Sequence, residues 1–211
     1  MTTRSRWWRL AGACALVATL AALTSGAAPR PARAQAAATL RAAAAFASIP
    51  DRAQRSIALF TEAGKVFQHA RCQNCHPGDD HPRQGEGGLH QPPVRGGADG
   101  DGVPGLRCAA CHGEANYDAV GMPGLADWHL APRSMNLRAP LATICAQLKD
   151  PDKNGSRSLE DVIKHVANDP LVAWAWAPGA GRLPAPGTHA TFFALLRAWA
   201  ATGAECPAVG S

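Results

Sequence analysis

Two stretches with the same core, RCQNCHPGDD at residues 71–80 and RCAACHGEAN at residues 107–116, decide how this chain can fold. Each contains the pattern Cys-x-x-Cys-His, formed by Cys72, Cys75 and His76 in the first and by Cys108, Cys111 and His112 in the second. In this pattern the two thiols add to the vinyl groups of a porphyrin, and the histidine binds the iron from one face. The sequence therefore predicts two covalently bound haem c groups, with His76 and His112 as iron ligands.

Paired cysteines have two other common uses. Four of them can hold a structural zinc ion, and a single pair can form a thioredoxin-like redox dithiol. Neither use explains why a histidine follows directly after both pairs, and the sequence lacks the βαβ pattern in which a redox dithiol sits. Covalent haem is the favoured interpretation, and zinc and a dithiol are the alternatives.

The N-terminus resembles an export signal, which haem attachment outside the cytoplasm requires. Arg4, Arg6 and Arg9 precede a mostly apolar stretch over residues 10–28, and an Ala-x-Ala cleavage site covers residues 32–34. We expect residues 1–34 to be removed and the mature protein to lie in the periplasm without a transmembrane segment. An uncleaved membrane anchor is the alternative.

The basic character of the whole chain comes from this signal. The chain has 21 basic and 16 acidic residues, and five of the arginines lie within residues 1–34. The mature chain therefore has as many acidic as basic residues and no clustered basic stretch. We expect no binding to nucleic acid.

Two cysteines are left once the motifs and the signal are set aside. Cys14 leaves with the signal, and four cysteines belong to the motifs, so Cys145 and Cys206 remain. In an oxidising compartment an even pair predicts a disulfide bond, and two free thiols are the alternative.

The rest of the chain predicts a small all-α, cytochrome c-like domain with long loops. Residues 35–50 form a loose alanine-rich lead-in, and residues 51–211 form one di-haem domain. Helices are expected from Asp51 towards Cys72, over about 140–148, from Ser158 to Asn168 with Ser158 and Asp161 as a capping box, and over about 188–203. Residues 77–107 and 113–140 are rich in Gly and Pro and are expected to wrap the haems without helix or strand. The spacing of the motifs is too short for two separate domains, so the haems should be neighbours.

Each iron also needs a sixth ligand or leaves that position open. Met135, in the loop WHLAPRSM after the second motif, is predicted for one iron, with His129 as its rival. His90 is predicted for the other iron because a stiff Pro-Pro pair follows it closely, with Met122 as its rival. His165 lies among apolar residues of a predicted helix and is interpreted as a packed or hydrogen-bonded core histidine in preference to an iron ligand.

Residues 150–161, with the sequence DPDKNGSRSLED, resemble a calcium-binding EF-hand loop in part. Asp150, Asp152 and Asn154 occupy its first three ligand positions. The last position holds Asp161 in place of the usual glutamate, and no partner hand exists. A polar turn capped by Ser158 is the favoured interpretation, and calcium binding stays open.

Four further stretches carry a family resemblance: WHLAPRSM at 128–135, ICAQLKDP at 144–151, NGSRSL at 154–159 and DPLVAWAWAPG at 169–179. Together with the motifs they resemble a group of two-motif c-type cytochromes labelled isoquinoline 1-oxidoreductase subunits, over about residues 70–207. The resemblance implies a periplasmic electron carrier that works with a molybdenum hydroxylase. No motif for molybdopterin or an iron–sulfur cluster is present in this chain.

The functional expectation is electron transfer between a periplasmic dehydrogenase or molybdenum hydroxylase and a downstream acceptor. No separate catalytic constellation stands out, so a carrier is favoured over an enzyme. The alternative is a peroxidase-like di-haem enzyme with one open iron.

Overall fold

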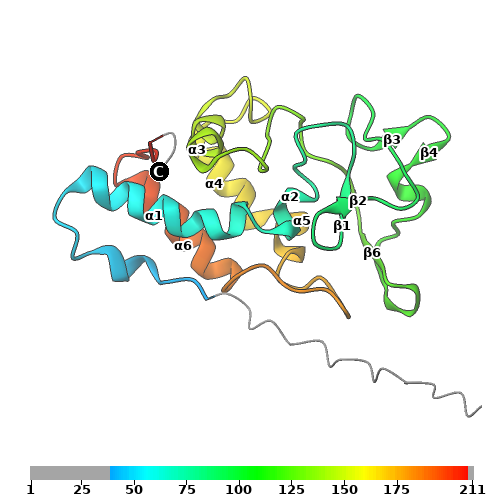
Figure 1. The fold of residues 1–211 in the computed structure, drawn as a ribbon, viewed down its shortest axis with the longest axis horizontal. Helices are drawn as coiled ribbons and strands as arrows, with labels where there is room; N and C mark the ends of the chain where they lie inside the picture. The colour runs from blue at the N-terminus through cyan, green and yellow to red at the C-terminus, as the bar shows by residue number, and fades with distance from the viewer. Residues whose placement is uncertain (1–38, 209–211) are drawn as a thin grey trace, which may run out of the picture. The chain divides into compact units, whose positions relative to one another are not determined.

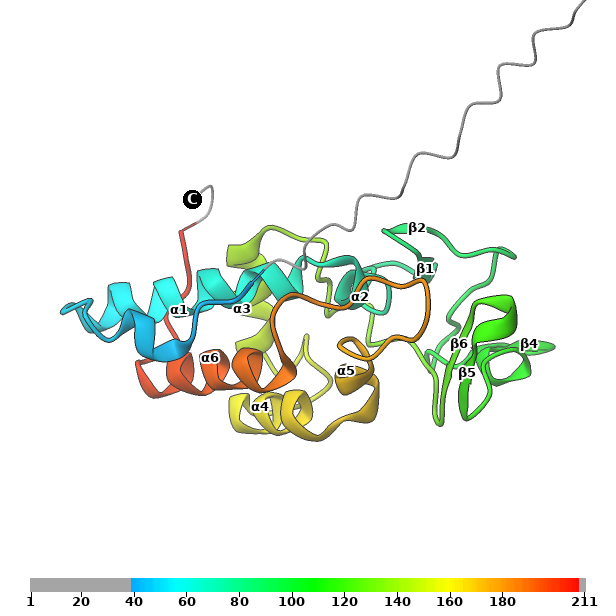
Figure 2. The ribbon, with the colours of Figure 1, turned by 90° about the horizontal axis from the view of Figure 1, so that it is seen from below.

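The computed structural model describes residues 39–208, so the predicted signal segment lies outside the described residues. Helices account for about 39% of the described residues, and Figures 1 and 2 show how they pack. The α-helices are α1 (Arg52–Phe67), α2 (Ala70–Gln73), α3 (Leu141–Lys149), α4 (Leu159–Asn168), α5 (Pro170–Trp174) and α6 (His189–Ala201). Short 3₁₀ helices are η1 (Ala43–Phe46), η2 (Cys108–Ala110) and η3 (Asp118–Val120).

The starts of the long helices follow from their capping residues. The side chain of Asp51 accepts a hydrogen bond of 2.7 Å from the backbone N–H of Gln54, which satisfies a free donor of α1. Ser158 and Asp161 form the expected reciprocal capping box at α4. Thr188 caps α6. Helices α3, α4 and α6 confirm the helices expected near 140–148, 158–168 and 188–203, although α3 has no side-chain cap.

Two details of the helices differ from the sequence prediction. The first long helix does not run into the motif: α1 ends at Phe67, and the separate single turn α2 carries Cys72. Helix α5 was not predicted. It begins at Pro170, which is tolerated at a first helical position, and Asp169 caps it by accepting hydrogen bonds from Leu171 and Val172.

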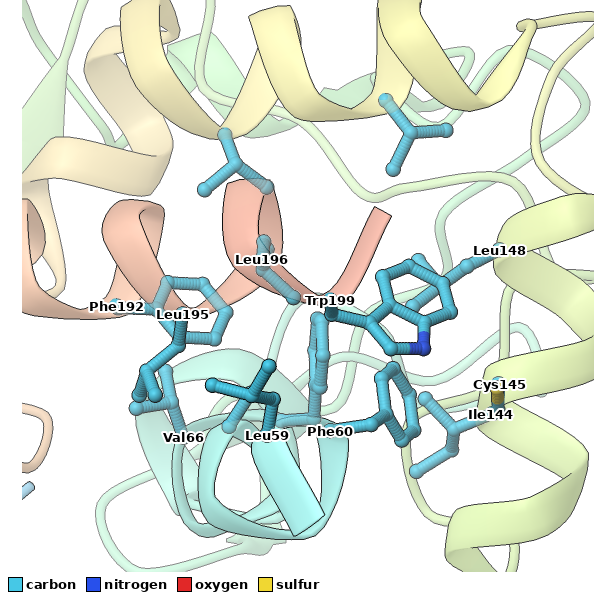
Figure 3. Close-up of a cluster of buried hydrophobic side chains, with 14 of the residues drawn as sticks. Leu59, Phe60, Val66, Ile144, Cys145, Leu148, Phe192, Leu195, Leu196 and Trp199 are labelled. Carbon is cyan, nitrogen blue, oxygen red and sulfur yellow. The ribbon is translucent and has the colours of Figure 1, made fainter. Parts of the chain in front are cut away.

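The hydrophobic core lies between α1, α3 and α6 (Figure 3). The ring of Phe60 lies 4.7 Å from that of Trp199, centroid to centroid, and the ring of Phe67 lies 5.1 Å from that of Phe192. Aromatic side chains of this size bury much apolar surface, which makes the crossing of α1 and α6 the main stabilising contact. Because Phe67 and Phe192 also line a cavity beside the first motif, this core supports that motif directly.

The predicted disulfide bond is confirmed: Cys145 of α3 is joined to Cys206, which follows α6. Cys145 is fully buried among the core side chains. The bond therefore ties the C-terminal segment to the middle of the chain.

The all-α prediction is wrong for the segment between α2 and α3. Three antiparallel hairpins lie there, on one side of the helices (Figures 1 and 2). They pair β1 (Arg83–Gln84) with β2 (Gly88–Leu89), β3 (Gly102–Val103) with β4 (Leu106–Arg107), and β5 (Ala115–Tyr117) with β6 (Met122–Leu125). Strands this short show no alternation of polar and apolar residues, so periodicity does not reveal them.

Glycine makes one of these hairpins possible. Gly102 in β3 has φ of +99°, and a Cβ atom there would lie 2.5 Å from the carbonyl oxygen of Leu106. Only glycine fits both the backbone angle and the close approach. Glycine, which led us to expect loops without strands, here permits a tight hairpin.

None of the helices within residues 39–208 is long and apolar enough to cross a membrane.

Removing the disulfide should lower the free energy of unfolding. The bond closes a loop with a sequence separation of 61 residues, and cross-links of this kind stabilise proteins by about 2–4 kcal/mol. We expect a loss in that range for the double variant Cys145→Ala, Cys206→Ala, measured by guanidinium unfolding of the haem-loaded protein. A thiol reductant is the matched control: it should lower wild-type stability to that of the variant and leave the variant unchanged. Equal stability without reductant would contradict the prediction.

Candidate haem sites

The first motif lies on one helical turn that faces a cavity. Cys72 belongs to α2, and the backbone N–H groups of Cys75 and His76 both bond to the carbonyl of Cys72. Residues three and four apart on such a turn share a face. As a result all three side chains line the same cavity, whose other walls include Phe67, Leu148 and Phe192.

A loop C-terminal to the second motif fixes the ring of His76. The backbone of Ala131 bonds to Cys75 at 3.1 Å, and that of Leu137 bonds to His76 at 3.1 Å. Between these two contacts, the Met135 carbonyl lies 3.1 Å from His76 Nδ1. A hydrogen bond donated there places the proton on Nδ1 and leaves Nε2 with its lone pair.

The chemical states in the first cavity suit covalent attachment. Burial, opposed only in part by the hydrogen bond to Met135, lowers the pKa of His76 to about 4, so the imidazole is neutral at pH 7. Burial also raises the pKa of Cys72 to about 12 and that of Cys75 to about 11. The cavity thus presents two protonated thiols and a neutral imidazole, the form that binds metals.

The second motif repeats this arrangement on different elements. Cys108 begins η2, and the N–H groups of Cys111 and His112 both bond to its carbonyl. The carbonyl of Pro123, in β6, lies 2.6 Å from His112 Nδ1. Trp128 stacks on the His112 ring at 4.7 Å with an angle of 14° between the planes. Burial lowers the pKa of His112, and the contact with Pro123 opposes this shift.

Both motif histidines therefore leave the same ring nitrogen, Nε2, available to bind a metal ion. Each Nδ1 is held by a backbone carbonyl, and neither Nε2 has a hydrogen-bond partner within residues 39–208. A backbone carbonyl on the second ring nitrogen is the usual support of a metal-bound histidine, because it fixes the tautomer and the ring plane. The geometry at both motifs fits an axial iron ligand.

A buried arginine with an unused hydrogen-bond donor gives a further test of whether the first cavity fits a haem. Arg71 is 6% exposed. Its Nη2 donates to the carbonyl of Gly85 and to Glu86, whereas its Nε has no partner. Arg71 lines the first cavity and a neighbouring cavity between the motifs. A buried guanidinium with an unused donor suits a ligand carboxylate, and haem carries two propionates.

The two motifs are close together, as their spacing predicts. Cys75 and His112 line the same intervening cavity. Burial is the main cause of the raised pKa of Cys75, Arg71 opposes it, and Cys108 adds to it. The described residues belong to one compact unit, so no domain boundary separates the motifs.

The predicted sixth ligands lie at the cavities. His90 and Met122 line the cavity that contains Cys108, Cys111 and His112. The rings of His90 and His112 are 5.9 Å apart, centroid to centroid, and His90 Nδ1 lies 2.8 Å from the Pro92 carbonyl. Met135 is 5% exposed and lines the first cavity.

Two other histidines also reach these cavities. His129 lines all three, and its Nδ1 contacts the carbonyl of Asp127. His165, interpreted from the sequence as a packed or hydrogen-bonded histidine, lines the first cavity, with Nδ1 3.1 Å from Asp169. The i,i+4 spacing of His165 and Asp169 was the available signal for this pair, and sequence reasoning missed it.

Residues 150–161 form a polar turn that is held by hydrogen bonds of its own side chains. The side-chain amide of buried Asn154 donates to the carbonyls of Leu148 and Arg157, and its oxygen accepts from the Arg157 N–H. Asp161 is used in the capping box with Ser158. Across the described part of the chain, no group of three or more His, Cys, Asp or Glu side chains is placed to hold a metal ion.

Comparison of the chain with family models, curated proteins and solved structures found no match. The resemblance to isoquinoline 1-oxidoreductase subunits therefore stays a prediction.

Replacing Arg71 should change the redox potential of the first haem. Removing a buried positive charge beside an iron favours its ferric state, so we expect Arg71→Met to lower that midpoint potential by tens of millivolts. Spectroelectrochemical titration measures both haems of the loaded protein.

Arg197→Met is the matched control, because it removes the same charge from an exposed position on α6. It should leave both potentials almost unchanged. An equal shift in the two variants would contradict a contact between Arg71 and the haem.

Proposed function

We propose that this chain is an exported di-haem c-type cytochrome that transfers electrons. Cys72, Cys75 and His76 would hold one haem, and Cys108, Cys111 and His112 the other. The donor would be a periplasmic dehydrogenase or molybdenum hydroxylase, and a downstream acceptor would receive the electrons. The observation that carries the proposal is the matched orientation of the two motif histidines, each with Nδ1 at a backbone carbonyl.

Each haem would supply a one-electron carrier that cycles between ferric and ferrous iron. The chain's own residues would set its position and surroundings. The two thiols of each motif would fix the ring, and the histidine Nε2 would bind the iron. The stacked Trp128 holds the plane of the His112 ring, and Trp174 packs against Trp128 edge-on at 5.1 Å.

In an electron carrier the sixth coordination position of each iron is filled, whereas an enzyme leaves it open on one iron. A candidate ligand at each motif therefore supports a carrier. At the second motif, the separation of 5.9 Å between the His90 and His112 rings matches two imidazoles that bind one iron from opposite faces. The support of His90 Nδ1 by Pro92 mirrors that of the motif histidines. We retain His90 as the proposed sixth ligand of this haem.

The two sites differ in exposure, which suggests how electrons could enter and leave. Cys111 is exposed, and Leu106 and Val120, which line the same cavity, are 38% and 62% exposed. Cys72 and Cys75 of the first motif are only partly exposed, and buried core side chains line part of the first cavity. The second haem would therefore have the more accessible edge for a redox partner.

Ligand challenge distinguishes a carrier from an enzyme. The loaded protein should show reversible reduced-minus-oxidised c-type spectra for both haems. Carbon monoxide and cyanide should bind slowly or not at all at neutral pH, because both irons would be six-coordinate. Peroxide turnover with a reduced donor should be negligible.

The double variant Cys108→Ala, Cys111→Ala is the control for the assignment, since it should retain only the first haem. Rapid binding of carbon monoxide by one haem of the wild-type protein, together with peroxide turnover, would support the enzyme and overturn the carrier.

A further inference from the structure

His165 is brought to the first cavity by the way α4 packs. The capping box at Ser158 fixes the start of the helix. Val162 and Val166, three residues before and one after His165, are each 5% exposed and belong to the core. With these neighbours anchored, His165 lines the cavity that also contains Cys72, Cys75 and His76.

Asp169, which lines the same cavity, fixes the ring of His165. Its Oδ2 lies 3.1 Å from His165 Nδ1. The carboxylate is itself held, because Oδ1 accepts hydrogen bonds from the N–H groups of Leu171 at 2.8 Å and Val172 at 3.3 Å. A carboxylate at Nδ1, like a backbone carbonyl, is a common support of a metal-binding histidine, since it fixes the tautomer and makes Nε2 more basic. No hydrogen bond to the Nε2 of His165 is present within the described residues.

The position of the Met135 carbonyl argues against Met135 as a ligand of the iron that His76 would bind. Its carbonyl lies at Nδ1 of His76, on the side of the ring away from Nε2. A ligand on the far face of an iron bound at Nε2 would lie about 9 Å from that carbonyl oxygen, by standard bond lengths. A methionine sulfur reaches only about 6 Å from its own carbonyl oxygen. Met135 is therefore on the wrong side of the ring.

His129 has a backbone carbonyl at Nδ1, as His90 has, whereas His165 has a carboxylate there. The Nδ1 of His129 contacts only the carbonyl of Asp127, two residues earlier in the same loop. It lines the cavities of both motifs, which places it between them. His165 belongs to a capped helix anchored in the core, and its Nδ1 contacts a carboxylate that is itself held by backbone N–H groups.

We propose that His165, positioned by Asp169, is the sixth ligand of the haem held by Cys72, Cys75 and His76. This inference rests on the proposed function. With His90 at the other haem, both irons would have two histidine ligands and no methionine. The potentials would then be lower than those of a cytochrome with a methionine ligand.

The test uses ferric holoprotein, with haem content measured first by mass spectrometry. Wild-type protein should show two low-spin irons by electron paramagnetic resonance and no sulfur-to-iron charge-transfer band. In His165→Ala we expect one of the two irons to become high-spin and to bind one equivalent of carbon monoxide after reduction. Added imidazole should restore the low-spin signal, which shows that the variant is folded and lacks only the ligand.

Two matched variants test the rivals. Met135→Leu and His129→Ala should both keep two low-spin irons. If either variant produces the high-spin iron, or if His165→Ala keeps both irons low-spin, the assignment of His165 is overturned while the proposed function stands. Wild-type protein without covalent haem would instead overturn the proposed function.

Asp169→Asn tests the positioning role separately. Asparagine can still cap α5, but it removes the negative charge at Nδ1. We expect both irons to stay low-spin and the potential of the first haem to rise, because a less basic imidazole stabilises ferric iron less. An unchanged potential would show that Asp169 serves α5 alone.

Discussion

The arrangement of both motifs depends on one hydrogen bond that occurs twice, from an imidazole Nδ1 to a backbone carbonyl. At His76 the acceptor is Met135, and at His112 it is Pro123. Each bond fixes the tautomer and aims Nε2 along a defined line. Without it the histidine could turn, and the two cysteines beside it would not be enough to define an iron site. The rest of the fold serves to bring these two carbonyls into place.

Different parts of the fold bring the carbonyl into place at the two motifs. At the first motif, the carbonyl belongs to a loop that is tied to the motif backbone at Ala131 and Leu137. Behind the motif stands the aromatic core of α1 and α6, held to α3 by the Cys145–Cys206 disulfide. At the second motif, the acceptor lies in the hairpin of β5 and β6, and Trp128 covers the ring. A helical half and a hairpin half thus share one chain and one intervening cavity.

The sequence predicted the features that depend on local chemistry. The capping residues Asp51 and Ser158, the pairing of Cys145 with Cys206 and the closeness of the motifs are all confirmed. The hairpins were missed because their strands are too short for a periodic signal. The contact of His165 with Asp169 agrees with the interpretation of His165 as a packed or hydrogen-bonded histidine, but its apolar neighbours Val162 and Val166 do not show which cavity it lines. Arg71 gave no signal, since only the folded structure shows its unused Nε.

The central claim is that one chain carries two covalent haems, each on its own Cys-x-x-Cys-His motif. The most direct measurement is the intact mass of the mature protein under denaturing conditions, after export in a host that attaches c-type haem. The account predicts the mass of the processed chain plus two haems, with peptides around Cys72 and Cys108 each retaining one. A mass equal to the polypeptide alone, or two haems lost on denaturation, would contradict it.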